Sequence, residues 1–136
     1  IICGDGPLKK DLLALSEDLG ISERVFFISD LSRRELFDLY NNMAVYANPS
    51  MREGLGLTAL EAQACGVPVV FFREADIPAE ATTHFVPSSD ESHFAANMHR
   101  LIFDNEYRES VTGSAKDVPD RGYMDKLYEI YGSIKK

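Results

Sequence analysis

Apolar runs of strand length alternate with amphipathic segments along this 136-residue chain. Residues 1–3, 25–28 and 67–72 are apolar runs that predict strands, and the run at 25–28 is typical of a strand covered on both faces. Two more runs, at residues 44–47 and 84–86, predict further strands. The run at residues 67–72 is the longest, so we expect it to form the central strand of a sheet.

The segments between these strands have helical periodicity. Leucines recur at helical intervals over residues 8–19, and Gly20 is placed to end that helix. Ser32 and Glu35 form a capping-box pattern, which predicts the start of the next helix. The buried stripe of that second helix is expected to comprise Leu36, Leu39, Tyr40 and Met43. Further helices are expected at residues 57–65, 91–102 and 106–116 and around residues 124–131.

Strands that alternate with helices predict a Rossmann-like, doubly wound parallel α/β sheet. In such sheets the ligand lies beyond the carboxyl ends of the strands. The loops expected to follow strands are residues 4–7, 29–31, 48–56 and 73–78. We therefore expect these four loops to share one edge of the sheet and to form a common binding site.

Composition limits the classes of function. The length suits a single domain, residues 1–136, and 45% hydrophobic with 26% charged residues is ordinary for a globular chain. A formal net charge of −8 argues against nucleic acid or an anionic membrane as the main partner. No apolar stretch approaches the ~20 residues of a transmembrane helix, and no signal-peptide pattern opens the chain. Cys3 and Cys65 are expected to be buried, reduced thiols, which favours a cytoplasmic location.

Residues 48–68 contain the strongest functional pattern. Glu53 and Glu61 lie eight residues apart, the first on a glycine-containing loop and the second within the helix that begins near Leu57. Glycine lets the backbone turn sharply and approach a ligand, and the amino end of a helix favours a phosphate. This combination predicts an anion site with two carboxylates for hydroxyl groups, as a nucleotide-sugar needs. A strand–loop–helix unit with solvated glutamates remains the alternative on spacing alone.

The residues of this pattern carry a resemblance to a known family. EGLGLTALEA at residues 53–62, followed by ACGVPVV at residues 64–70, closely resembles the Glu-x7-Glu segment of retaining GT-B glycosyltransferases. This family includes glycogen, sucrose and lipopolysaccharide sugar transferases. The similarity extends to GDGPL at residues 4–8, RVFFIS at 24–29, ELFDLYNNMAVYANPS at 35–50 and IPAE at 77–80. The resemblance implies the C-terminal, donor-binding half of a GT-B fold.

The resemblance also implies roles for individual residues. Glu61 would bind the ribose hydroxyls of a nucleotide. Glu53 would contact the donor sugar and is the candidate catalytic residue. The remaining donor-binding residues would lie in the glycine loop and helix start, where backbone N–H groups meet the diphosphate, and in the loop that holds the base: Gly54, Leu55, Gly56, Leu57, Thr58, Ser29, Asp30 and Leu31.

A parent enzyme of this kind transfers a hexose from a nucleoside-diphosphate sugar to a glycan, lipid or small acceptor, with retention. No metal or other cofactor is expected, because Asp-x-Asp is absent and His84, His93 and His99 lack zinc-site spacing. The family's phosphate-binding arginine and lysine, and its N-terminal acceptor domain, have no counterpart in residues 1–136. We therefore expect the chain alone to be inactive. The parent is expected to be cytoplasmic or attached peripherally to a membrane.

The beginning of the chain raises a question about the sheet. In the order 3-2-1-4-5-6, a strand–helix segment before residue 1 would supply the central strand. An N-terminally truncated chain would leave a gap between the strands at residues 1–3 and 44–47, with unpaired backbone groups. These strands could pair directly, another molecule could fill the gap through self-association, or the chain could be a piece of a longer protein.

Two functions of other classes are alternatives to the enzyme. A non-catalytic nucleotide-binding or regulatory module with the same fold is the alternative, although retention of both Glu53 and Glu61 favours the enzyme. A receiver-like signalling domain is rejected, because Ala47, Asn48 and Pro49 stand where its phosphoacceptor aspartate is needed.

Overall fold

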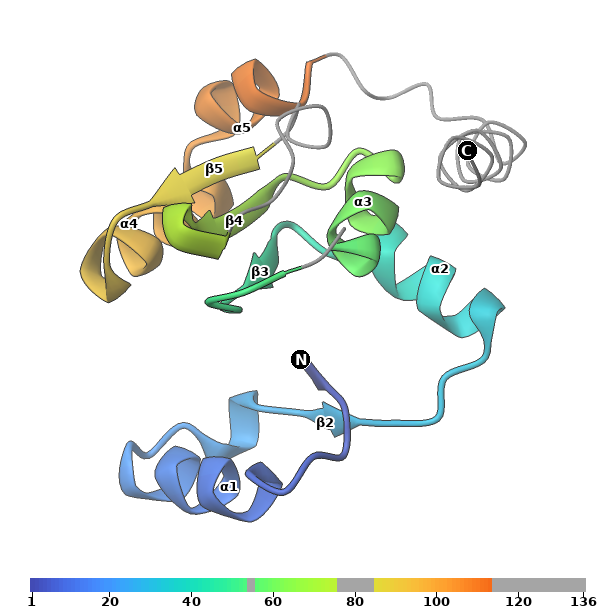
Figure 1. Ribbon diagram of the computed structural model, residues 1–136, viewed down its shortest axis with the longest axis vertical. Coiled ribbons are helices and arrows are strands. Elements are labelled where there is room, and N and C mark those ends of the chain that lie inside the picture. The colour runs from blue at the N-terminus through green and yellow to red at the C-terminus, as the bar shows by residue number, and fades with distance from the viewer. Residues whose placement is uncertain (54–55, 76–84, 114–136) are drawn as a thin grey trace. The chain divides into compact units, whose positions relative to one another are not determined.

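The computed structural model describes residues 1–53, 56–75 and 85–113. The chain forms two compact units, Ile1–Leu36 and Phe37–Lys136, shown in Figure 1. Each unit has its own parallel sheet with helices beside it, so the predicted class, Rossmann-like parallel α/β, is confirmed. That residues 1–136 form a single domain stays a prediction.

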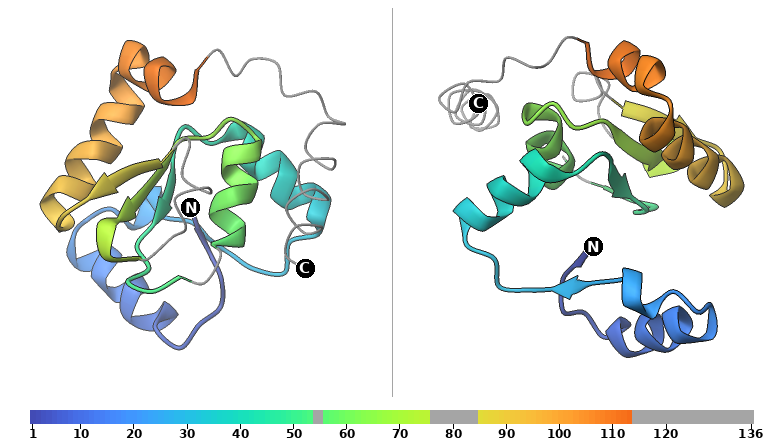
Figure 2. Two further views of the ribbon diagram at one scale, coloured as in Figure 1. Left: turned by 45° about the horizontal axis from the view of Figure 1, so that its top comes forward. Right: turned by 180° about the vertical axis from the view of Figure 1, so that it is seen from behind.

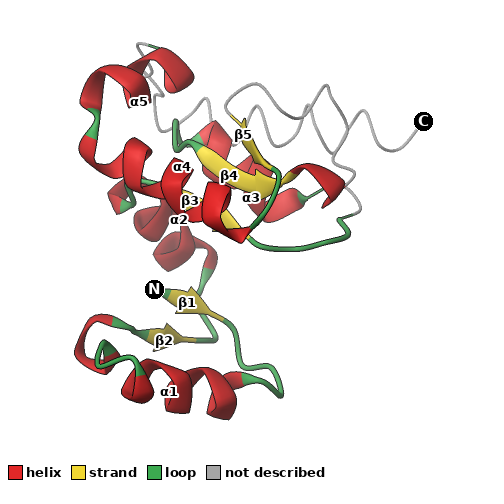
Figure 3. Cartoon of the chain, turned by 90° about the vertical axis from the view of Figure 1, so that its left-hand side faces the viewer, coloured by secondary structure: helices red, strands yellow, loops and turns green. Residues whose placement is uncertain are grey.

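The first unit is a small strand–helix–strand arrangement. It contains β1 (Ile2–Cys3), α1 (Lys9–Asp18), a 3₁₀ turn η1 (Ser22–Arg24) and β2 (Phe27–Ile28). The two strands are parallel, with Ile2 opposite Phe27 and Cys3 opposite Ile28. Cys3 is exposed and Cys65 is half-buried, so the prediction that both thiols are buried is wrong; at Cys3 the reason is that so short a sheet covers few side chains. Figure 3 shows α1 alongside this sheet. Helix α1 ends before Gly20, whose φ of 65° lies in the left-handed region that glycine tolerates.

The leucine stripe of α1 does not form a core in this structure. Leu8, Leu15 and Leu19 are 64%, 51% and 62% exposed, whereas Ser16 is the buried residue of the helix. The reason is geometric, because two strands of two residues each offer little apolar surface on which a helix could bury its side chains. Helical spacing was therefore a good guide to the element and a poor guide to its burial.

Helix α2 (Arg33–Asn42) begins with the predicted capping box. The backbone N–H and the hydroxyl of Ser32 donate to Oε2 of Glu35 at 2.8 and 2.6 Å. In return, the Glu35 N–H donates to Oγ of Ser32 at 3.3 Å. The hydrogen bonds from the Ser32 side chain and backbone lower the pKa of Glu35. Of the stripe expected on this helix, Tyr40 is buried, at 2% exposure, while Leu36, Leu39 and Met43 are half-buried.

The second unit contains a three-stranded parallel sheet in the order β3-β4-β5. These strands are β3 (Tyr46–Asn48), β4 (Val69–Phe72) and β5 (Phe85–Ser88), and β4 is central, as predicted. Strand β3 begins two residues later than the apolar run. Its first ladder bond joins the Tyr46 N–H to the carbonyl of Pro68, so pairing with β4 sets where β3 begins.

Helices cover both faces of this sheet, as Figures 1 and 2 show. Helices α2 and α3 (Leu57–Ala64) lie on one face, and α4 (Glu91–Phe103) and α5 (Asn105–Thr112) lie on the other. The core under α4 consists of Val70, Val86, Phe94 and Leu101. Burying a side chain of this size stabilises a fold by about 1.5–3 kcal/mol. This core fixes the sheet whose carboxyl edge carries the motif.

The strand order matches two parts of the predicted 3-2-1-4-5-6 arrangement. Within the described ranges, β1 pairs with β2 in the first unit, and β3 pairs with β4 in the second. Several expected features lie outside the described residues: Gly54 and Leu55, the IPAE segment and His84, residues 114–116 of the predicted fifth helix, and the final helix around residues 124–131.

Candidate functional site

The loop that carries Glu53 lies at the carboxyl edge of the three-stranded sheet. Asn48, the last residue of β3, is opposite Phe71 in the parallel register, so the segments after β3 and β4 leave the sheet at the same edge. A hydrogen bond of 3.0 Å from the Glu53 N–H to the carbonyl of Ala75 joins these two segments. Ala75 is fully buried at the end of the 3₁₀ turn η2 (Arg73–Ala75). Glu53, itself half-buried, is thus held at the end of β4.

Helix α3 starts directly after this loop with an amino end that no described side chain caps. Gly56 is the N-cap residue and has φ 59° and ψ 47°, in the left-handed region. The first intrahelical bond runs from the Leu60 N–H to the Gly56 carbonyl at 3.0 Å. The N–H groups of Leu57 and Thr58 precede that bond and have no acceptor within the helix. Together with the helix dipole, these N–H groups favour an anion.

Glu61 lies one turn further along α3 and is held by a tyrosine. The hydroxyl of Tyr40 donates to Oε2 of Glu61 at 3.1 Å, across 21 residues of sequence. The Glu61 side chain is half-buried. Its charge also contributes to a raised pKa at Cys65: burial, followed by the charge of Glu61, raises the pKa of that thiol to about 11. Cys65 is therefore protonated at neutral pH.

Asn48 brings an unusual buried polar group to the same edge. Its side chain is 4% exposed, and Oδ1 accepts a hydrogen bond from the Ser50 N–H at 3.2 Å. Nδ2 finds no hydrogen-bond partner in the described part of the chain. An unpaired buried donor costs about 1–3 kcal/mol, so its presence beside the motif loop is a local weakness in the fold.

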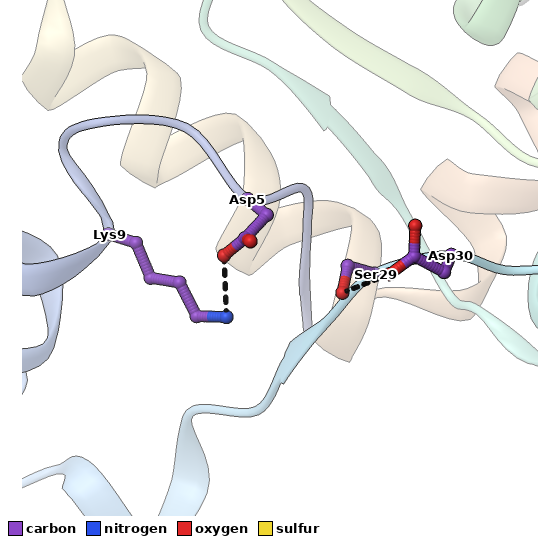
Figure 4. Close-up of polar contacts among 4 residues, drawn as sticks. All are labelled: Asp5, Lys9, Ser29 and Asp30. Atoms are coloured by element: carbon purple, nitrogen blue, oxygen red, sulfur yellow. Dashed lines mark hydrogen bonds and ion pairs between the residues drawn. The ribbon is translucent and has the colours of Figure 1, made fainter.

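The first unit contains the third part of the predicted site. β1 and β2 are parallel, so the residues after Cys3 and Ile28 leave the sheet at one edge. Ser29 donates to Oδ2 of Asp30 at 3.2 Å, and Asp30 has φ 57°, which is uncommon for a residue other than glycine. Beside them, Lys9 forms a 2.8 Å ion pair with Asp5 across the loop that follows β1, as Figure 4 shows.

The structure therefore brings together part of the predicted site. Glu53, Gly56, Leu57, Thr58 and Glu61 follow one another from the carboxyl end of β3 into α3 of the second unit. Ser29, Asp30 and Leu31 belong to the first unit, at the carboxyl end of β2. Tyr40 is the residue that sequence reasoning placed in a core stripe without recognising its polar contact. The available signal was its hydroxyl, since a buried tyrosine O–H usually finds a hydrogen-bond partner.

A cavity of about 760 Å³ lies at the opposite end of the second unit. Met43 and Ala44 before β3, and Gly66 and Pro68 before β4, line one side of it, and the end of α5 lines the other. These positions are at the amino ends of the strands. Ligands of doubly wound sheets bind at the carboxyl ends, so we do not assign the nucleotide site to this cavity.

Two further observations concern metals and membranes. In residues 1–53, 56–75 and 85–113, no three His, Cys, Asp or Glu side chains gather closely enough to hold a metal ion. The same ranges contain no helix with the length and hydropathy needed to cross a bilayer.

Comparison with solved structures defines the class of the fold. WaaG, a glycosyltransferase involved in lipopolysaccharide biosynthesis, superimposes with a TM-score of 0.69 at 19% sequence identity, covering 88% of this chain and 33% of that one. This likeness, with the parallel sheets, shows that the chain has the GT-B type of Rossmann-like fold. The sequence model for glycosyl transferases group 1 matches residues 1–118. The chain belongs to the glycosyl transferases group 1 family.

Curated relatives agree with this family. The D-inositol 3-phosphate glycosyltransferase of Corynebacterium jeikeium (strain K411) is 36% identical over 147 aligned residues, which cover 98% of this chain and 35% of that protein. The enzyme of the same name from Saccharomonospora viridis is 32% identical over 130 residues, covering 90% of this chain and 30% of the relative. The chain thus spans about a third of the length of these relatives.

Proposed function

We propose that this chain is the donor-binding domain of a glycosyltransferase that transfers a hexose, with retention, from a nucleoside-diphosphate sugar to a glycan, lipid or small acceptor. The observation that carries the proposal is on α3. One short helix has an amino end without a described capping side chain and, one turn later, a carboxylate oriented by a buried hydroxyl. The amino end of the helix would bind a diphosphate, and the carboxylate would bind a ribose. These are adjacent parts of one nucleotide.

Each group has a distinct role in this proposal. The N–H groups of Leu57 and Thr58 meet the diphosphate, and left-handed Gly56 allows the phosphate to approach the backbone closely. The Glu61 carboxylate accepts hydrogen bonds from the ribose hydroxyls. Glu53, on the loop bound to Ala75, faces the donor sugar and its developing positive charge. Ser29, Asp30 and Leu31 hold the base, while Gly54 and Leu55 complete the loop.

The reaction requires above all that the negative charge on the leaving diphosphate be stabilised. Negative charge grows on the diphosphate as the glycosidic bond breaks, while the sugar gains positive character. Groups that bind the diphosphate more strongly as its charge grows lower the barrier. The N–H groups at the start of α3 can do this without a metal ion, because their dipoles are already oriented before the reaction. We therefore propose that binding and transfer need no divalent cation.

Calorimetric titration of the chain with UDP, GDP and ADP tests the proposal. We expect saturable binding of one of these nucleotides, with the same affinity in magnesium and in EDTA. Glu61→Ala should weaken binding at least about tenfold, a loss of about 1.4 kcal/mol. Glu106→Ala, in the first turn of α5, removes the same kind of charge away from the site and should leave the affinity unchanged. A folded wild-type chain that binds none of the three nucleotides would refute the proposal.

A further inference from the structure

Tyr40 lies on a helix outside the Glu-x7-Glu segment, yet its polar atom reaches into the site. The side chain is 2% exposed, among the most fully buried in the described residues. Its hydroxyl donates to Oε2 of Glu61 at 3.1 Å, from α2 to α3. Hydrogen bonds to ionised groups are stronger than those between neutral groups, and a partly buried location shields this one from water.

A second tyrosine supports the first. The rings of Tyr40 and Tyr46 pack edge to face, with centroids 6.2 Å apart and planes inclined at 66°. The hydroxyl of Tyr46 donates to Oγ1 of Thr58 at 2.9 Å. Thr58 and Glu61 are three residues apart on α3, so they lie on the same face of the helix. The hydroxyls of Tyr40, on α2, and Tyr46, on β3, therefore both donate hydrogen bonds to this face of α3.

We propose that Tyr40 is a positioning residue for nucleotide recognition: its hydroxyl occupies one oxygen of Glu61 and thereby presents the other oxygen to the ribose. The inference rests on the proposed function of Glu61. No second donor to this carboxylate comes from the described ranges, which leaves Oε1 to accept a hydrogen bond from a ligand. An ionised carboxylate has about four acceptor positions on its two oxygens, so binding Tyr40 does not exhaust it.

The advantage of such an arrangement is preorganisation. A free glutamate side chain rotates about three bonds, and fixing it upon ligand binding costs conformational entropy. Tyr40 is fixed by its burial and by Tyr46, so the orientation of Glu61 is set before the ligand arrives. Removing the hydroxyl should release the carboxylate, while the contact between the diphosphate and the start of α3 remains. The substitution should therefore weaken only the part of the nucleotide affinity that comes from the ribose hydroxyls.

The experiment uses Tyr40→Phe, which removes the hydroxyl and keeps the buried ring. Calorimetry would compare whichever of UDP, GDP and ADP binds best with the 2′,3′-dideoxy diphosphate of the same base. In the wild type the ribonucleotide should bind more tightly. In Tyr40→Phe, its affinity should fall roughly five- to tenfold, while the affinity for the dideoxy compound stays the same, so that the ratio between the two moves towards one. A fall of this size is typical of the net contribution of one hydrogen bond.

Two controls separate positioning from a general structural effect. Tyr107→Phe removes a tyrosine hydroxyl from α5, away from the site, and should leave both affinities unchanged. In a Glu61→Gln background, Tyr40→Phe should cause no further loss of ribonucleotide affinity. Far-UV circular dichroism and thermal unfolding would verify the fold of each variant.

The outcomes that contradict the inference are distinct from those that contradict the proposed function. If Tyr40→Phe weakens both nucleotides equally, or neither, Tyr40 does not position Glu61 and the proposed function stands. If the two substitutions are additive, Tyr40 acts independently of Glu61, which also overturns the inference. If the wild type binds no nucleotide, the proposed function fails, and the role of Tyr40 fails with it.

Discussion

Replacing Gly56 with alanine tests the geometry at the start of α3. Gly56 has φ 59° and ψ 47°, where a Cβ atom comes too close to the following carbonyl oxygen. An L-residue in this region costs about 1–2 kcal/mol, which corresponds to a fall in Tm of about 3–8 °C for a chain of this size. Because Gly56 is buried, there is little room for the backbone to relax. We expect Gly56→Ala to lower both stability and nucleotide affinity.

Gly66 supplies a matched control at the other end of the same helix. It has φ 76°, and its N–H donates to the Gln63 carbonyl at 2.9 Å while the Val67 N–H donates to the Ala62 carbonyl at 3.0 Å. These two bonds form a Schellman motif, which needs a left-handed residue. Gly66→Ala should therefore lose about 1–2 kcal/mol of stability as well. It should leave nucleotide affinity unchanged, because the carboxyl end of α3 has no part in the proposed site.

Urea unfolding measures the stability of both variants, and titration with UDP, GDP and ADP measures affinity. We expect similar stability losses in the two, with at least about a tenfold rise in Kd for Gly56→Ala alone. A Gly56→Ala chain as stable as the wild type would refute the left-handed conformation. Equal losses of affinity in both variants would show that the effect arises from general destabilisation of α3 and not from blocked approach to its amino end.

Three further predictions concern the rest of the fold. Leu101→Ala should cost about 2–5 kcal/mol in urea unfolding, since Leu101 is fully buried under the sheet, and a loss below about 1 kcal/mol would contradict its place in the core. The pKa of Asp90, the N-cap of α4, is lowered chiefly by the hydrogen bond from the His93 N–H, so its stabilising effect is present above the ordinary aspartate pKa and is lost as the pH falls through the lowered one. In Asp90→Asn, the free energy of unfolding should therefore fall less between neutral and acidic pH than in the wild type. An unchanged pH dependence would contradict the role of Asp90 as the N-cap of α4. Iodoacetamide at pH 8 should label exposed Cys3 long before Cys65, whose pKa is raised to about 11, as peptide mass spectrometry would show; equal rates would contradict this.

The elements and their parallel pairing could be predicted because they depend on local pattern. The capping box at Ser32 and Glu35, the glycine that ends α1 and the central position of β4 all follow from neighbouring residues or from run length. Strand limits were less accurate. β3 begins at Tyr46, which lies opposite Val69 and donates its N–H to the Pro68 carbonyl, and that alignment depends on a strand more than twenty residues away.

The partners of the site residues could not be predicted, because they arise from packing between elements. Periodicity marks Tyr40 as a core residue and gives no information on which side chain its hydroxyl meets across α2 and α3. Asn48 was expected in the loop that follows the apolar run at residues 44–47, yet it is the buried last residue of β3 with an unpaired Nδ2. In both cases the polar atom of a buried side chain is determined by tertiary structure that the sequence pattern does not encode.

The two left-handed glycines that flank α3 fix the length of the helix and the position of Glu61 within it. Gly56 and Gly66 fix where the helix begins and ends, and Glu61 is the fifth of its eight residues, about 6 Å along the axis from Leu57. Inserting one residue before Glu61 would rotate its side chain by about 100° and remove it from Tyr40. Substitutions on the exposed face of α3 can accumulate during evolution without this penalty. Insertions and deletions within α3 would carry this penalty. We therefore expect the length of this segment to be more strongly conserved than its amino-acid composition.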